Sequence, residues 1–329
     1  MAPSVNLDNK LQSEVDAIYN SKVLLEPATS EQWKKLYKDL EMNPGQLKED
    51  IQTIRTWLAK QSHLPQTASD NLIASFIVGC KNSLERTKQK LDAFYTIRNQ
   101  LPELFLNNDP TRQEAIDATR PVRIFLLPKL HPDGCRILVT SYRNNDTTFY
   151  DVKENLKRIL GVMTIRMNSE PFYRGDYMIC DATHFSLGHA VKLTPTLMRN
   201  FLHCIQDVLP LQIKGIVFYN APPILEKTLN NVIKPFLKKK IADRIHLYSQ
   251  DHTALLKHFP KEVLPKNLGG DEPVDDVIDA LWDKKLESYR DWFMNEGNET
   301  TDESKRPSNA SFHPSQFGLE GSFRKLTID

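Results

Sequence analysis

Asp181, His184 and His189 lie close together after an apolar run of strand length, so they are the first candidates for chemistry. A carboxylate and two imidazoles could serve acid–base catalysis or bind a metal ion. Their spacing fits no established ligand pattern, and Ser186 lacks the flanking glycines of a nucleophile elbow. We therefore interpret the group as a structural strand-to-loop transition and keep a hydrolase as the minor alternative.

Other chemistries have even less support in the sequence. No glycine-rich phosphate loop follows a strand-like run, and the chain has only 12 glycines to form one. The four cysteines, Cys80, Cys135, Cys180 and Cys204, lie far apart and lack the close pairs of zinc and redox motifs. We expect free thiols in a reducing compartment, with no metal site, no cofactor and no enzymatic activity.

Charge and hydropathy set further limits. Lys plus Arg number 43 against 42 for Asp plus Glu, so a net charge of +1 gives no overall field that attracts nucleic acid. Any anion binding must therefore be local. No apolar run approaches the roughly 18 residues that a membrane span requires, and the first thirty residues hold no apolar block like that of a signal peptide. We expect a cytoplasmic monomer that touches membranes only from outside.

The elements that would position a site fall into two units. After an N-terminal extension, residues 1–29, the range 30–115 carries four amphipathic helical patterns, beginning near Ser30, Leu47, Asp70 and Leu84. Short amphipathic helices joined by short loops predict a small all-α bundle.

Residues 116–272 follow a different pattern. Strand-like apolar runs at 136–141, 177–180, 213–219 and 244–248 are separated by helical patterns at 151–167 and from Thr194 onward, with Pro195 in the first turn. This alternation predicts an α/β fold with a mainly parallel sheet and right-handed crossovers. A C-terminal helix is expected at 273–294, and the polar stretch 295–329 is expected to be largely disordered.

The stretch from Lys214 to Arg244 allows two interpretations. After its strand, the apolar residues recur at steps of three and four: Leu225, Leu229, Val232, Ile233 and Phe236. Pro235 should break the helix at Lys234, and a lysine run follows at 238–240. The stretch is either an ordinary crossover helix with solvated lysines or a mobile lid over an apolar cavity, whose lysines meet anionic lipid headgroups. Periodicity alone does not choose between them.

An ordered series of motifs resembles the CRAL-TRIO lipid-binding family. It comprises DATHFSLGHAVKLTP from Asp181, PLQIKG, NAPPIL, IKPFLKKKIADRIH and HFPKEVLPKNLGG, which ends at Gly270. The stretches IRTWLAKQSHLP and SLERTKQKLDAFYTIRNQLPELF resemble the helical domain that precedes it in that family, so the resemblance covers about residues 30–290. The closing GSFRKLTID is similar to the C-terminus of invertebrate members. The resemblance implies a soluble carrier that encloses one hydrophobic molecule and exchanges it at a membrane, with the helix after Asn220 as the gate.

The resemblance also implies which residues form the site. The pocket wall carries over as Val162, Ile165, Ser169, Ile179, Cys204, Ile205, Leu211, Ile216, Leu229, Val232, Ile233 and Phe236. Among these, Ser169 would contact a ligand hydroxyl. The expected ligand is a tocopherol, a retinoid, a carotenoid or another isoprenoid.

Basic residues beside the gate bind phosphoinositide headgroups in tocopherol-carrying members of the family. They carry over as Lys214, Lys240 and Arg244, while Gln212 replaces one basic residue and no N-terminal counterpart is evident around Val78 to Lys81. Lys234, Lys238 and Lys239 are expected to complete the headgroup site. The alternatives are a phosphoinositide-sensing scaffold or regulator with a vestigial pocket, and a phospholipid-exchanging carrier.

Overall fold

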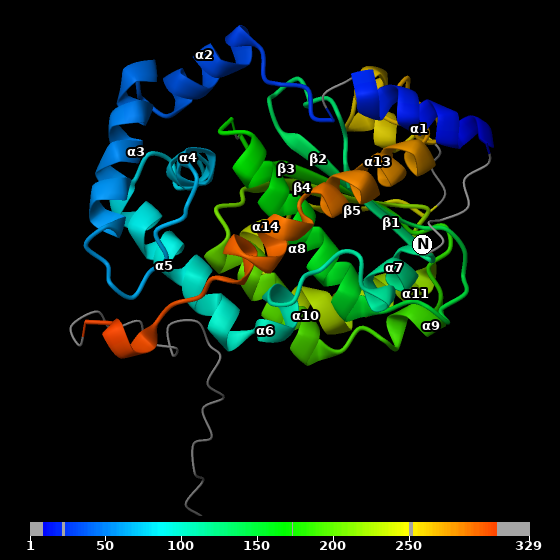
Figure 1. Ribbon diagram of the computed structural model, residues 1–329. Coiled ribbons are helices and arrows are strands. Elements are labelled where there is room, and N and C mark those ends of the chain that lie inside the picture. The colour runs from blue at the N-terminus through cyan, green and yellow to red at the C-terminus, as the bar shows by residue number, and fades with distance from the viewer. Residues whose placement is uncertain (1–8, 22–23, 173, 250–252, 308–329) are drawn as a thin grey trace, which may run out of the picture.

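The computed structural model describes residues 9–21, 24–172, 174–249 and 253–307 (Figure 1). The predicted closing motif, GSFRKLTID, lies outside these residues. A helical bundle stands beside a sheet covered by helices (Figure 1). None of the helices in the described residues has both the length and the apolar character needed to cross a membrane.

The bundle consists of the four predicted helices and a short fifth one. They are α2 (Ser30–Asp39), α3 (Pro44–Leu58), α4 (Asp70–Gly79), α5 (Leu84–Gln100) and α6 (Pro102–Phe105). Thr29, rather than the predicted Ser30, caps α2, because its side chain accepts a hydrogen bond from the Gln32 backbone in a capping box. Phe76 and Phe94 are fully buried between α4 and α5, with ring centroids 5.4 Å apart.

The sheet confirms the predicted α/β class. Its five strands, in spatial order, are β1 (Val122–Leu126), β2 (Arg136–Tyr142), β3 (Asp176–Asp181), β4 (Ile213–Tyr219) and β5 (Ile245–Leu247). The last four are parallel, and β1, which the sequence analysis missed, pairs with β2 in the antiparallel direction.

All crossovers between the parallel strands lie on one face of the sheet. Neighbours in the sheet are neighbours in the chain, and right-handed connections that always advance in one direction must stay on one side. These connections hold α8 (Val152–Ser169), α9 (Leu187–Ala190), α10 (Pro195–His203), α11 (Pro223–Thr228) and α12 (Lys239–Ala242). Three short 3₁₀ turns at 255–268 cover the opposite face, where the Phe259 and Tyr177 rings lie 5.5 Å apart.

The outer edge of β1 is covered by α13 (Asp275–Ser288). The Ile124 amide donates to Asp279 over 3.0 Å, and the Trp282 indole donates to the Leu126 carbonyl over 2.9 Å. These bonds satisfy backbone groups that an open edge would leave unpaired. On the far side of α13 lies α1 (Asn9–Ser21), whose Val15 packs with Val277 in a small apolar cluster.

The chain beyond α13 returns to the bundle. It passes through α14 (Arg290–Met294) and then forms a strap, residues 295–306, which contains two 3₁₀ turns and lies across α5. Arg98 of α5 donates to the Glu299 carbonyl, and Arg306 donates to Asp92 over 2.8 Å. The prediction of disorder is therefore wrong for 295–307. The buried Arg98 guanidinium requires hydrogen-bond partners, and the carbonyls of this stretch supply them, which holds the stretch in place. Residues 308–329 lie outside the described part.

Candidate functional site

One row of side chains crossing the sheet forms the floor of an apolar cavity. Its members are direct partners in the strand register: Leu138, Met178, Ile216 and Ile245. The next row adds Cys180 and Phe218. Because side chains alternate between the faces of a strand, each second residue of β3 and β4 faces the crossover helices.

The wall of the cavity comes from α10 and the π-helical turn that follows it, Cys204–Val208. The lining residues are spaced as one helical stripe: Met198, Phe201, Leu202 and Ile205. The predicted start of this helix is confirmed, since Thr194 caps it and Pro195 occupies its first turn. On the other side, α8 contributes Ile159 and Met163, one turn apart.

A cover over the cavity runs from Pro223 to Ala242, and we call it the lid segment. It begins with α11, continues as a π-helical turn (Leu229–Ile233) and a 3₁₀ turn (Lys234–Phe236), and ends with α12. The predicted break at Lys234 is confirmed. Every fourth residue of the segment lines the cavity: Leu229, Ile233, Leu237 and Ile241.

The structure brings together some of the residues predicted to line a pocket. Those that line this cavity are Ile205, Leu211, Ile216, Leu229 and Ile233. Those that do not are Val162, Ile165, Ser169, Ile179, Cys204, Val232 and Phe236. Four of the second group are completely buried in the packed core instead: Val162, Ile165, Ile179 and Cys204.

The reason for most of these differences is a shift of one position. Ile179 lies between Met178 and Cys180, so its side chain points to the opposite face of the sheet. Cys204 precedes Ile205 by about 100° around its helix. In the same way Val162 precedes Met163, Val232 precedes Ile233 and Phe236 precedes Leu237. Ile165 lies about 200° around α8 from Met163 and so faces away from the cavity.

Ser169, the predicted polar contact, lies elsewhere. It is the exposed last residue of α8, and its hydroxyl is 3.2 Å from that of Tyr289. Among the described residues that line the cavity, only Gln206 and Cys180 carry a polar side-chain group.

The cavity is small for a complete lipid. Its volume is about 140 Å³, close to that of an engineered apolar cavity that stays dry and binds benzene. Pockets for drug-sized ligands span roughly 300–1,000 Å³. In this closed shape the cavity has room for one end of a hydrocarbon chain, and a larger guest requires the lid segment to move outward.

The predicted headgroup cations lie in two places. On the lid segment, Lys238 pairs with Asp207, and Lys239 pairs with Asp243 at 2.8 Å. Lys234 and Lys240 are exposed and form no ion pair within the described residues. Arg244 is half-buried before β5, where its guanidinium donates to the Ile213 carbonyl next to Lys214.

Lys214 faces a hollow of about 180 Å³ between the bundle and the sheet. The hollow also holds Lys81, from the turn after α4, and Arg174, from the loop before β3, which pairs with Asp39. The lysine stem lies over Gly175, where an added Cβ would come within 2.6 Å of it. Lys81 thus places a cation from the N-terminal bundle beside Lys214, and three basic side chains and one acidic side chain line the hollow.

The side chains around Asp181 form local turn and packing contacts. Asp181 accepts hydrogen bonds from the backbone and hydroxyl of Thr183 at 3.0 and 2.6 Å. His189 is fully buried between Tyr142 and Tyr150, and its Nδ1 lies 2.9 Å from the Ser186 hydroxyl. Burial and the Lys192 charge lower the pKa of His189. The described residues contain no group of three or more side chains that could hold a metal ion.

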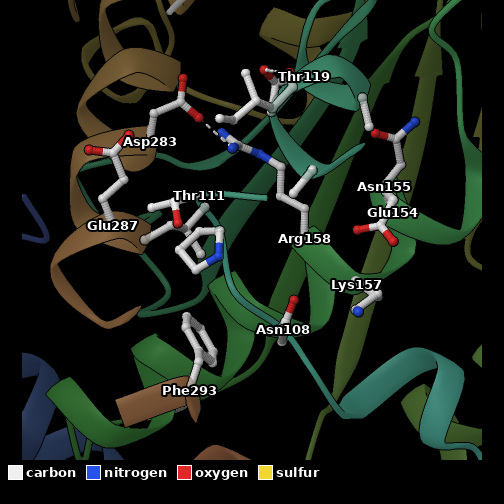
Figure 2. Close-up of a pocket in the computed structure, with 15 residues that line it drawn as sticks. Asn108, Thr111, Thr119, Glu154, Asn155, Lys157, Arg158, Asp283, Glu287 and Phe293 are labelled. Carbon is white, nitrogen blue, oxygen red and sulfur yellow. Dashed lines mark hydrogen bonds and ion pairs between the residues drawn. The ribbon is translucent and has the colours of Figure 1, made fainter. Parts of the chain in front are cut away.

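A larger hollow of about 340 Å³ lies between α7 (Gln113–Thr119), α8, α13 and α14, with Arg158 at its centre (Figure 2). Arg158 donates to Asp283 at 2.5 Å and to Asp279 at 2.9 Å. The Glu154 carboxylate beside it accepts from Arg112 at 2.7 Å. These charges neutralise one another, and apolar side chains such as Leu286 and Phe293 complete a mixed lining, unlike the wholly apolar surface of the cavity under the lid segment.

Two family models match the chain. The CRAL/TRIO domain matches residues 122–270, which contain the sheet, the cavity and the lid segment. The Pinta-like UBA domain matches residues 43–115, within the helical bundle. Residues 122–270 therefore form a CRAL/TRIO domain, and the predicted resemblance is confirmed. This family holds lipid-binding and lipid-transfer proteins.

The chain is also similar to individual proteins. Human "Alpha-tocopherol transfer protein-like" is 27% identical over 264 residues, which cover 80% of this chain and 76% of that protein. Rat Clavesin-2 is 29% identical over 267 residues, 80% of this chain and 79% of that protein. The crystal structure of Sfh5 aligns with 86% of this chain and all of its own, at 14% identity and a TM-score of 0.42.

Proposed function

We propose that this chain is a monomeric cytoplasmic carrier that encloses the hydrocarbon part of one lipid and exchanges it at phosphoinositide-bearing membranes. The observation that supports this most directly is the apolar cavity under a segmented cover. Tocopherols, retinoids, carotenoids and other isoprenoids all present the hydrocarbon that such a wall accepts.

Docking would use the cationic hollow. Lys81, Arg174 and Lys214 converge there, and lysine and arginine are the side chains that bind phosphate groups. Lys240 and Lys234, which are exposed on the lid segment, add attraction to an anionic surface. Each basic group near such a surface contributes on the order of 1 kcal/mol.

Opening would use two exposed apolar side chains next to α11, the first helix of the lid segment. Leu187 of α9 and Val191, one turn later, are 62% and 69% exposed, and α9 packs against α11. In a bilayer they would meet hydrocarbon instead of water. The apolar face of the lid segment would also contact the bilayer hydrocarbon when the segment moves outward. This contact lowers the free energy of opening.

Exchange then needs no chemical step. Each methylene loses about 0.8 kcal/mol of burial free energy when it leaves the bilayer and regains about the same amount in the cavity. The transfer is near balance, so its rate depends on docking and lid opening.

The test begins with the purified full chain. Organic extraction and mass spectrometry should recover about one lipid per protein, and a fluorescent isoprenoid should move faster to vesicles that contain phosphoinositide than to neutral vesicles. A scaffold with a vestigial pocket would bind these vesicles but yield no lipid, and a phospholipid carrier would yield phospholipid.

A further inference from the structure

The polar side chain at the cavity wall, Gln206, is committed to the lid segment. Its Nε2 donates to the Phe236 carbonyl over 3.0 Å, and its Oε1 accepts from the Lys238 amide over 2.7 Å. The second N–H of the amide group reaches the Leu202 carbonyl over 3.1 Å. Both donors are therefore engaged, and the acceptor oxygen already receives one hydrogen bond from the lid segment.

The two lid groups need this partner because of Pro235. The 3₁₀ turn ends at Phe236 and α12 starts at Lys239, so the carbonyl and the amide on either side of Leu237 lie outside regular helix. Unpaired backbone groups beside an apolar cavity are unfavourable. Gln206 pairs both of them and holds Leu237 against the cavity.

The ion pair between Asp207 and Lys238 strengthens the same attachment. Burial alone would raise the pKa of Asp207, but hydrogen bonds from His203 and Lys238 outweigh burial and lower it. The carboxylate is thus charged at neutral pH and stays paired with the lid segment.

From these contacts we propose that the cavity selects lipids whose inner end is pure hydrocarbon, and that Gln206 is the residue that determines this specificity. This inference rests on the proposed carrier function. A hydroxyl at the inner end meets no exposed polar atom at the cavity surface, because among the described lining residues only Cys180 and Gln206 carry polar groups and the Gln206 amide is turned to the lid segment. Such a hydroxyl either stays without a hydrogen bond or competes for the Gln206 amide. In the second case Gln206 loses its bonds to the lid segment, and the closed state becomes less stable. A tocopherol would therefore enter with its hydrocarbon tail first.

A matched pair of probes tests the inference on the full-length chain: geranylgeraniol, and the same alcohol with a second hydroxyl at its far end. We expect the second hydroxyl to weaken binding ten- to a hundredfold, on the order of the effect of an unpaired buried hydroxyl. Fluorescence displacement measures both affinities under identical conditions. Equal affinities would overturn the inference and leave the carrier proposal intact, whereas binding of neither probe would overturn both.

A variant supplies the complementary measurement. Met198 lines the same wall and is close to glutamine in length, so Met198→Gln adds an amide that is not tied to the lid segment. In this variant the preference for the unmodified alcohol should shrink at least threefold. A preference equal to that of the wild type would argue against polar pairing as its cause. The wild-type comparison decides the question even if the variant folds poorly.

Discussion

Replacing Ile216 with phenylalanine tests whether the space over the sheet is a void. Ile216 lies at the centre of the cavity floor. At about 24 cal/mol per Å³, an empty cavity of 140 Å³ lowers the stability of the lipid-free protein by about 3 kcal/mol. A ring that occupies part of this space should restore about 1 kcal/mol and raise Tm by about 2–4 °C. The same ring should exclude the lipid.

Val217→Phe is the matched control. Val217 follows directly in β4, is 1% exposed, and points to the opposite, fully packed face of the sheet. Extra atoms there have no space, so the substitution should lower the free energy of unfolding by about 1–3 kcal/mol. The two neighbouring substitutions are thus expected to act in opposite directions.

The assay compares both variants with the wild type after removal of lipid. Calorimetry and urea unfolding give the stabilities, and mass spectrometry of extracts gives the retained lipid. If Ile216→Phe destabilised the protein as much as Val217→Phe, the space would be packed in solution and the reasoning behind the carrier would fail.

Three further predictions concern docking, the lid segment and a buried lysine. Lys81→Ala with Lys214→Ala should weaken binding to phosphoinositide vesicles about thirtyfold without loss of bound lipid; unchanged sedimentation with vesicles would remove the hollow from docking. Ile233→Asp should abolish lipid retention, measured in extracts, while Val232→Asp should retain most of it; equal losses would contradict the assigned faces. Burial lowers the pKa of Lys90 from 10.5 to about 8, so the unfolded chain binds more protons between these values and stability rises with pH there. Urea unfolding should show a rise of at most about 3 kcal/mol that Lys90→Met lacks, and an identical rise in the variant would contradict the assignment.

The sequence predicted the elements of the site more reliably than their orientation. Alternating apolar runs and helical patterns located β2, β3, β4, α8 and α10, because local periodicity records which residues are buried. Periodicity does not record whether a buried side chain faces a void or a packed core. Val232 and Ile233 are both apolar and adjacent, yet only Ile233 lines the cavity.

Groups assembled from distant segments could not be predicted. Lys81, Arg174 and Lys214 come from three separate segments and meet where Gly79 packs directly against Pro210, so closely that an added Cβ would lie 2.2 Å from the proline carbonyl oxygen. The strap at 295–306 was missed for a similar reason. Its polar composition is typical of disorder, and its order depends on the buried Arg98 of another element.

The backbone of the lid segment is least regular in its middle, where a π-helical turn meets a 3₁₀ turn. Its outer parts are tied down, since α11 packs against α9 and α12 leads directly into the paired strand β5. A rigid flap would have to detach at one of these anchored ends before a guest could leave. A cover that bends at its centre can keep both anchors in place, so the empty and loaded forms should differ mainly between Leu229 and Lys234, before the Phe236 and Lys238 groups that Gln206 holds. A crosslink joining α9 to α11 should then leave exchange intact.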